Sequence, residues 1–199
     1  MGSTFFSLHF HLVFSTKERR PFIKPEWQPR LHSYLGGILK GMNGVPEIVG
    51  GVEDHVHILA SLRPVHCIAD VLRDLKKESS TWAKENFNRR FTWQEGYAAF
   101  TVSPTATDSV RRYIATQEAH HRKYSFVDEL RELLNAAGIE FDEKYLLGGL
   151  APLRGAGHND DFSGGLRGLR PPATFLQPFG LRWGESTISL PSKKASPWA

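Results

Sequence analysis

The stretch VEDHVHILASL, from Val52 to Leu62, joins an acidic turn to a run of apolar residues and contains two histidines separated by one valine. A short apolar run that follows a turn is typical of a buried strand. Because successive strand side chains point to opposite faces, His55 and His57 project from one face, about 7 Å apart along the strand. Two imidazoles so placed can share one cation. The same pattern also fits one hydrogen-bonded core histidine beside an exposed one.

On either side of this stretch, strand and helix patterns alternate along the chain. The predicted elements are a strand at 5–16, a helix at 25–44, strands at 46–53 and 55–62, a helix at 68–82, a strand at 91–103 that Gly96 interrupts, and a helix at 107–124. The first six follow the order of the split βαβ unit. We therefore predict an α+β, ferredoxin-like (RRM-like) sandwich, in which an antiparallel sheet carries helices on one face and an additional C-terminal helix follows.

Composition divides the chain near residue 148. Nine of the 18 glycines and six of the 12 prolines lie in residues 148–199, which lack helical or strand periodicity. We expect a folded domain over residues 1–147 and a Gly/Pro-rich tail over 148–199 that is disordered or loosely docked. The tail holds six of the 25 basic and three of the 21 acidic residues, so the domain before it is nearly neutral. Net charge therefore does not by itself indicate a nucleic-acid partner.

The sequence shows no sign of a membrane or secreted protein. No apolar run approaches the roughly 20 residues that a membrane span requires, and the N-terminus lacks the basic leader and cleavage site of a signal peptide. Cys67 is the only cysteine, which excludes an internal disulfide and a cysteine-based zinc cluster. We expect a cytoplasmic protein with no membrane partner.

The helix predicted at 107–124 contains the sequence YIATQ, in which Tyr113 and Gln117 are four residues apart. Residues at this spacing lie on one helix face, so a phenol and a carboxamide point the same way. A tyrosine packed by its ring beside a solvated glutamine is the ordinary alternative. Beside the histidine pair, however, these two residues supply a candidate nucleophile and a candidate third ligand.

This combination resembles the small HUH-class, single-tyrosine transposases of insertion sequences and their palindrome-processing, REP-associated relatives. The resemblance covers roughly Phe5 to Tyr145. DHVHIL is similar to the family's HUH strand, GVPEIVGGV to its preceding strand, GYAAFTVS to its last sheet strand, and VRRYIATQEAHH to its nucleophile helix. The resemblance implies a DNA transposase that cleaves and rejoins single-stranded DNA and recognises hairpins at element ends. It also implies a homodimer, although the longer palindrome-processing relatives can be monomeric.

The resemblance also assigns roles to four residues. It implies that His55, His57 and Gln117 hold a divalent metal, Mg²⁺ or Mn²⁺, and that Tyr113 attacks DNA to form a 5′-phosphotyrosine. The chemistry agrees, because a phosphodiester is a poor electrophile whose oxygens repel a nucleophile, and a cation relieves both problems. Imidazole ligands suit Zn, Mn, Co or Ni better than Mg, so we expect an open, weakly occupied site.

Several basic residues are candidates for positioning DNA through its phosphates. They are Lys17, Arg19, Arg20, Arg111, Arg112, His120 and His121. A solvated surface explains these residues equally well.

Other residues repeat parts of the pattern. His9 and His11 have the same spacing as the histidine pair and rival it for metal binding, but packing or substrate contacts are favoured for them, because no acidic or amide partner is near in sequence. Tyr97 lies in a predicted strand, where aromatic packing is the ordinary role. Asp54 is a candidate for a hydrogen bond to a ligating histidine.

Two other classes of function fit parts of the sequence. The predicted topology also occurs in non-catalytic modules that bind single-stranded nucleic acid, which would need neither Tyr113 nor metal. A metal-dependent hydrolase could use the His-x-His pair and an activated water, and it would cleave without a covalent adduct.

Overall fold

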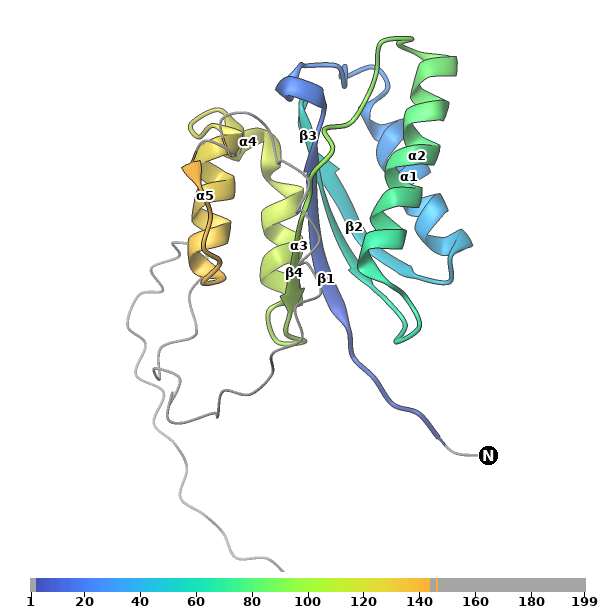
Figure 1. Ribbon diagram of the computed structural model, residues 1–199, viewed down its shortest axis with the longest axis vertical. Coiled ribbons are helices and arrows are strands. Elements are labelled where there is room, and N and C mark those ends of the chain that lie inside the picture. Colours follow the sequence, from blue (N-terminus) through green and yellow to red (C-terminus); the bar gives the residue numbers. More distant parts are fainter. Residues whose placement is uncertain (1–2, 144–145, 147–199) are drawn as a thin grey trace, which may run out of the picture. The chain divides into compact units, whose positions relative to one another are not determined.

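A four-stranded antiparallel sheet lies at the centre of the computed structural model, which describes residues 3–143 and 146 (Figure 1). The strands are β1 (His9–Ser15), β2 (Val45–Gly51), β3 (His55–Ser61) and β4 (Ala98–Val102), in the order β2-β3-β1-β4. All neighbouring strands are antiparallel, as the split βαβ unit requires. The predicted ferredoxin-like α+β fold is confirmed, although β1 begins at His9 and not at residue 5.

Helices lie on both faces of this sheet (Figure 1). The two helices α1 (Gln28–Gly41) and α2 (Ile68–Asn86) cover one face, as predicted. The helices α3 (Thr107–Ala115), α4 (Gln117–His121) and α5 (Phe126–Ala136) lie on the other face, and a short 3-10 helix, η1 (Lys17–Arg19), follows β1.

Side-chain alternation along β1 and β3 divides the sheet into an apolar face and a histidine face. Leu12 and Phe14 of β1 are paired with Ile58 and Val56 of β3, and all four side chains are completely buried in the core under α1 and α2. Full burial of an aliphatic or aromatic side chain stabilises the fold by about 1.5–3 kcal/mol. The intervening residues of the same strands, which include the three histidines at positions 11, 55 and 57, therefore face α3, α4 and α5.

The fourth strand is shorter than predicted, because its pairing is interrupted around Gly96, where the interruption was predicted, and only an isolated bridge between Thr16 and Trp93 continues it. The sequence predicts a strand from residue 91, but β4 begins at Ala98. Lys76 Nζ on α2 donates hydrogen bonds to the carbonyl oxygens of Glu95 (2.7 Å) and Gly96 (3.1 Å). These carbonyls are thus satisfied by a side chain and not by a neighbouring strand.

The helix predicted at 107–124 is two helices, because the chain turns at Thr116. The Thr116 amide is shared between the carbonyl oxygens of Arg112 and Tyr113, both at 3.2 Å, and its hydroxyl donates to the same two oxygens. Threonine competes in this way with the regular helical hydrogen bonds. The prediction of one continuous helix is therefore wrong, but the prediction that the side chains of Tyr113 and Gln117 point the same way is confirmed, since both bond to Glu129 Oε1.

The helix α5 was not predicted. Ser125 begins it, because its hydroxyl oxygen accepts a hydrogen bond from the Asp128 amide at 3.2 Å. The buried side chains of α5 follow helical spacing, and they are Phe126, Glu129, Leu130, Leu133 and Leu134. One charged residue thus lies on an otherwise apolar face.

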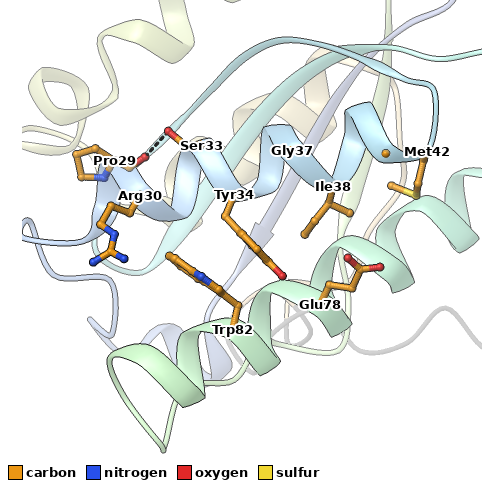
Figure 2. Close-up of a pocket in the computed structure, with 10 residues that line it drawn as sticks. Pro29, Arg30, Ser33, Tyr34, Gly37, Ile38, Met42, Glu78 and Trp82 are labelled. Carbon is orange, nitrogen blue, oxygen red and sulfur yellow. Dashed lines mark hydrogen bonds between the residues drawn. The ribbon is translucent and has the colours of Figure 1, made fainter.

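The outer side of α1 and α2 forms a groove of about 900 Å³ (Figure 2). Tyr34 and Trp82 stack in it, with ring centroids 4.6 Å apart and an angle of 10° between the rings. This groove lies on the sheet face that does not carry the histidines. Among the described residues no helix is long and apolar enough to cross a membrane. The predicted tail, residues 148–199, lies outside the described residues and stays a prediction.

Candidate active site

His55 and His57 lie side by side on β3 and are completely buried. Their ring centroids are 5.0 Å apart. Each Nδ1 atom has a partner behind it. That of His55 lies 2.6 Å from Asp54 Oδ1, and that of His57 lies 2.9 Å from His11 Nε2. When both Nδ1 atoms carry the proton, both Nε2 atoms present lone pairs to the same space. The predicted bond from Asp54 to a histidine of the pair is confirmed.

Tyr113 on α3 faces this pair. The helix packs closely on β2 at Gly50, where an added Cβ would lie 2.6 Å from the carbonyl oxygen of Ile114. This close approach brings the neighbouring Tyr113 ring within 5.8 Å of the His57 ring, measured between centroids. The Tyr113 hydroxyl donates a hydrogen bond to Glu129 Oε1. The structure thus brings the predicted nucleophile and the histidine pair together within one chain.

Glu129 on α5 stands between the tyrosine and the histidines. Only 2% of its side chain is exposed. Its Oε2 atom lies 3.3 Å from His57 Nε2, 3.5 Å from His55 Nε2 and 3.2 Å from His121 Nε2. The sequence analysis did not single out this residue. The feature of the sequence that could have indicated this residue is an isolated carboxylate on the apolar stripe that follows Ser125.

Gln117, the predicted third ligand, is also buried in this place. Its Nε2 atom donates a hydrogen bond to Glu129 Oε1 at 2.9 Å, and its own Oε1 atom has no hydrogen-bond partner. Although Thr116 separates Gln117 from the helix of Tyr113, both side chains reach the same carboxylate oxygen.

Six polar atoms converge here without hydrogen-bond partners. Of the seven such buried side-chain atoms among the described residues, these six are Nε2 of His55, His57, His120 and His121, Oε1 of Gln117 and Oε2 of Glu129. An unsatisfied buried polar atom costs about 1–3 kcal/mol, so this concentration is typical of a site that binds a ligand. One ligand atom from each of His55, His57, His121 and Glu129 lies within 4.8 Å of the others, and this set fits a divalent metal.

The electrostatics also favour a cation. Burial lowers the pKa of His57 to about 4 and that of His11 to about 3, so both imidazoles are neutral at neutral pH. Burial acts to raise the pKa of Glu129, but the facing imidazoles, first that of His57, outweigh it and hold this pKa below its usual range. Burial and the Glu129 charge raise the pKa of Tyr113 above its usual range. A buried carboxylate thus faces the neutral imidazole of His57 and a neutral phenol.

The first group of candidate DNA-binding residues lies at η1. Lys17 and Arg20 are exposed, and Arg20 pairs with Glu18 at 2.5 Å. Arg19 is half-buried, and its guanidinium donates a hydrogen bond to the Leu146 carbonyl oxygen at 3.0 Å. Two of these three side chains therefore already have protein partners.

The second group lies near the opposite end of β1. Arg111 and Arg112 are exposed on α3, and Arg111 donates to Glu47 Oε2 at 2.9 Å. The same carboxylate pairs with His9 at 2.5 Å, at the start of β1, whereas η1 follows the end of that strand. The structure therefore does not bring the two arginine groups into one patch.

His120 and His121 lie at the cluster and not on a separate surface. His121 Nε2 is 3.2 Å from Glu129 Oε2, and His120 Nε2 is 3.7 Å from Glu129 Oε1. The His121 side chain is only 10% exposed, and the His120 side chain is 22% exposed. The sequence analysis considered them for phosphate contacts and not for metal binding.

Comparison with known proteins identifies the family of the chain. Residues 4–117 match the family described as "Transposase IS200 like". This segment is more than half of the chain, and the protein therefore belongs to the IS200-like transposases, a class of DNA strand transferases that use a metal. The matched segment ends at Gln117, before most of α4 and all of α5.

Individual relatives have low sequence identity to the chain. The chain is 29% identical over 120 residues to the ISDra2 transposase TnpA of Deinococcus radiodurans, and the aligned segment covers 56% of this chain and 85% of that protein. A solved transposase structure from Deinococcus radiodurans has 24% identity and a TM-score of 0.49, covering 59% of this chain and 95% of that one. A REP-associated tyrosine transposase bound to a REP hairpin has 16% identity and a TM-score of 0.44, covering 85% and 98%.

Proposed function

We propose that this transposase cleaves and rejoins single-stranded DNA through a covalent bond between Tyr113 and a 5′ phosphate. One observation carries the proposal. The Tyr113 ring packs 5.8 Å from that of His57, and its hydroxyl bonds to the carboxylate that faces both histidines of the pair. A nucleophile and a cation site are useful for phosphoryl transfer only when they meet in this way.

His55 and His57 would hold a divalent cation, with Gln117 as the third ligand that the family resemblance implies. When bound, such a cation neutralises the phosphate oxygens and stabilises the leaving 3′ oxygen. Residues of the chain orient the ligands of this cation. Asp54 and His11 hold the two imidazoles in orientation from behind.

The reaction then consists of one displacement and its reversal. The Tyr113 hydroxyl passes its proton to the Glu129 carboxylate, which accepts its hydrogen bond, and the Tyr113 oxygen attacks phosphorus in line with the 3′ oxygen, whose bond to phosphorus breaks. The products are a 5′-phosphotyrosine and a 3′-hydroxyl, which has gained a proton. Attack on the phosphotyrosine by a 3′-hydroxyl of another strand restores a phosphodiester and releases Tyr113, so joining needs no ATP.

We expect the nucleotide to lie in a pocket beside the cluster. The pocket has a volume of about 510 Å³; its lining includes Arg19, Arg122, Tyr124 and His121, and also the carboxylates of Glu53, Asp54 and Glu118. Guanidinium groups bind phosphates, and an aromatic ring stacks on an unpaired base. Hairpin recognition at the element ends and assembly as a homodimer belong to this proposal as expectations from the family resemblance.

The test is to trap the covalent adduct. The full chain is incubated with Mn²⁺ and a labelled single-stranded hairpin oligonucleotide, and the products are separated on a denaturing gel. We expect a protein–DNA adduct from the wild type and none from Tyr113→Phe. The matched control is Tyr124→Phe, which removes the hydroxyl of an exposed tyrosine at the same pocket and should keep the adduct.

Other outcomes are equally informative. An adduct that survives Tyr113→Phe and disappears in Tyr124→Phe would assign the nucleophile to Tyr124. Cleavage by the wild type without any adduct would indicate a hydrolase that activates water, and binding without cleavage would indicate a non-catalytic module.

A further inference from the structure

The geometry points to a four-ligand cation site made by His55, His57, His121 and Glu129, in which the helices α4 and α5 complete the histidine pair of β3. This inference rests on the proposed function only for the use of His55 and His57. It adds two ligands that lie beyond the segment shared with the transposase family, and it makes α5 part of the active site.

The distances around the carboxylate are those between ligands of one ion. Glu129 Oε2 is 3.2 Å from His121 Nε2, 3.3 Å from His57 Nε2 and 3.5 Å from His55 Nε2. In a tetrahedral site with metal–ligand bonds of about 2.1 Å, any two ligand atoms are about 3.4 Å apart. The three distances from Glu129 Oε2 match this spacing, and all four ligand atoms lie within 4.8 Å of one another. None of these four atoms has a hydrogen-bond partner of regular geometry, and one divalent cation would satisfy all four at once.

The same carboxylate connects this cation site to the nucleophile. Its Oε1 atom accepts hydrogen bonds from the Tyr113 hydroxyl and from Gln117 Nε2, the latter at 2.9 Å. Glu129 therefore holds the Tyr113 oxygen next to the cation that its other oxygen binds. In this arrangement Gln117 is a positioning residue in place of the third ligand that the resemblance implies, because its amide group orients the carboxylate.

The ligand set also determines which metal is favoured. Three imidazoles and one carboxylate in a tetrahedral arrangement suit Zn²⁺ and Co²⁺, whereas Mg²⁺ requires octahedral oxygen ligands and retains its waters. We expect the resting protein to bind Co²⁺ and Zn²⁺ at least about tenfold more tightly than Mg²⁺.

The experiment is a Co²⁺ titration of the full chain without DNA, followed by visible absorption, because tetrahedral Co²⁺ absorbs far more strongly than octahedral Co²⁺. Dissociation constants for Co²⁺ and Mg²⁺ are measured by calorimetry. We expect an intense tetrahedral spectrum from the wild type. Glu129→Gln should lose this spectrum and weaken Co²⁺ binding by about tenfold or more.

The matched control is Glu132→Gln, which removes an exposed carboxylate from the same helix and should leave the spectrum and the affinity unchanged. His121→Asn tests the second added ligand and should have the effect of Glu129→Gln. Thermal unfolding of every variant without metal shows whether each retains the wild-type fold, so that loss of binding is not loss of folding.

Two results would overturn the inference: a weak octahedral spectrum from the wild type, or wild-type Co²⁺ affinity in both Glu129→Gln and His121→Asn. If His55→Ala then still abolishes binding, the histidine pair remains a metal site and only the added ligands are wrong. Failure of the proposed function is separate, since it would appear as an intact Co²⁺ site with no Tyr113 adduct.

Discussion

His11 shows how the site depends on single residues that touch neither metal nor DNA. Its imidazole is buried on β1 and stacks against that of His57, with ring centroids 5.1 Å apart. The hydrogen bond between His57 Nδ1 and His11 Nε2 fixes the orientation of the His57 ring and favours a lone pair on its Nε2 atom. The sequence analysis considered His11 as a rival ligand, whereas the structure places it behind the histidine pair.

We predict that His11→Ala weakens Mn²⁺ binding about 10–100-fold, the range typical for loss of a hydrogen bond to a ligating histidine. The measurement is calorimetric titration of the full chain with Mn²⁺. His9→Ala is the matched control, because His9 lies on the same strand but pairs with Glu47 away from the cluster. Equal losses in the two variants would argue against a specific role for His11.

At the scale of elements, the site depends on how closely α3 packs against β2. Gly50 permits this packing, because a Cβ at this position would lie 2.6 Å from the Ile114 carbonyl oxygen and 2.7 Å from Ile114 Cγ2. A backbone oxygen cannot rotate away as the end of a side chain can. Any side chain at Gly50 must therefore move α3, and Tyr113 moves with it.

We predict that Gly50→Ala destabilises the fold by about 1–3 kcal/mol, as overpacking does, and slows formation of the DNA adduct. Denaturant unfolding and the rate of adduct formation are the two measurements. Gly37→Ala is the control, because no atom lies within 4 Å of the added Cβ and this helical position should be stabilised by up to about 1 kcal/mol. Wild-type stability in Gly50→Ala would contradict this account of the packing.

The elements also show how far prediction from sequence reached. The pair His55 and His57 was predictable because a strand has a period of two residues, and so was the order of strands and helices. The turn at Thr116 was not, because it depends on one side chain competing for backbone carbonyls. Glu129 was missed because its role depends on α5 folding back over the sheet, which no local pattern around the histidines indicates. The helix cap at Ser125 was the feature of the sequence that could have predicted α5.

At the scale of the whole molecule, Tyr113 and the histidine pair meet within one chain. A second chain is therefore not needed to supply the nucleophile, whether or not the protein forms the homodimer that the resemblance implies. Two inactive chains that lack different parts of the site would then be unable to restore each other.

We predict that a mixture of Tyr113→Phe and His57→Ala chains forms no more adduct than either variant alone. The measurement is the denaturing-gel assay, after the two proteins have been mixed and incubated to allow exchange of subunits. Wild-type chains mixed with each variant should keep their own activity, which excludes inhibition by the variant. Adduct formation by the mixture would instead show that partner chains exchange their tyrosine helices.

The two halves of the site are attached to the sheet in different ways. The histidine pair lies on β3, which has hydrogen-bonded strands on both sides. The Glu129 carboxylate lies on α5, which follows a turn and a short loop. We therefore expect that, where a DNA phosphate needs more room at the site, α4 and α5 shift and the imidazole pair on β3 keeps its position.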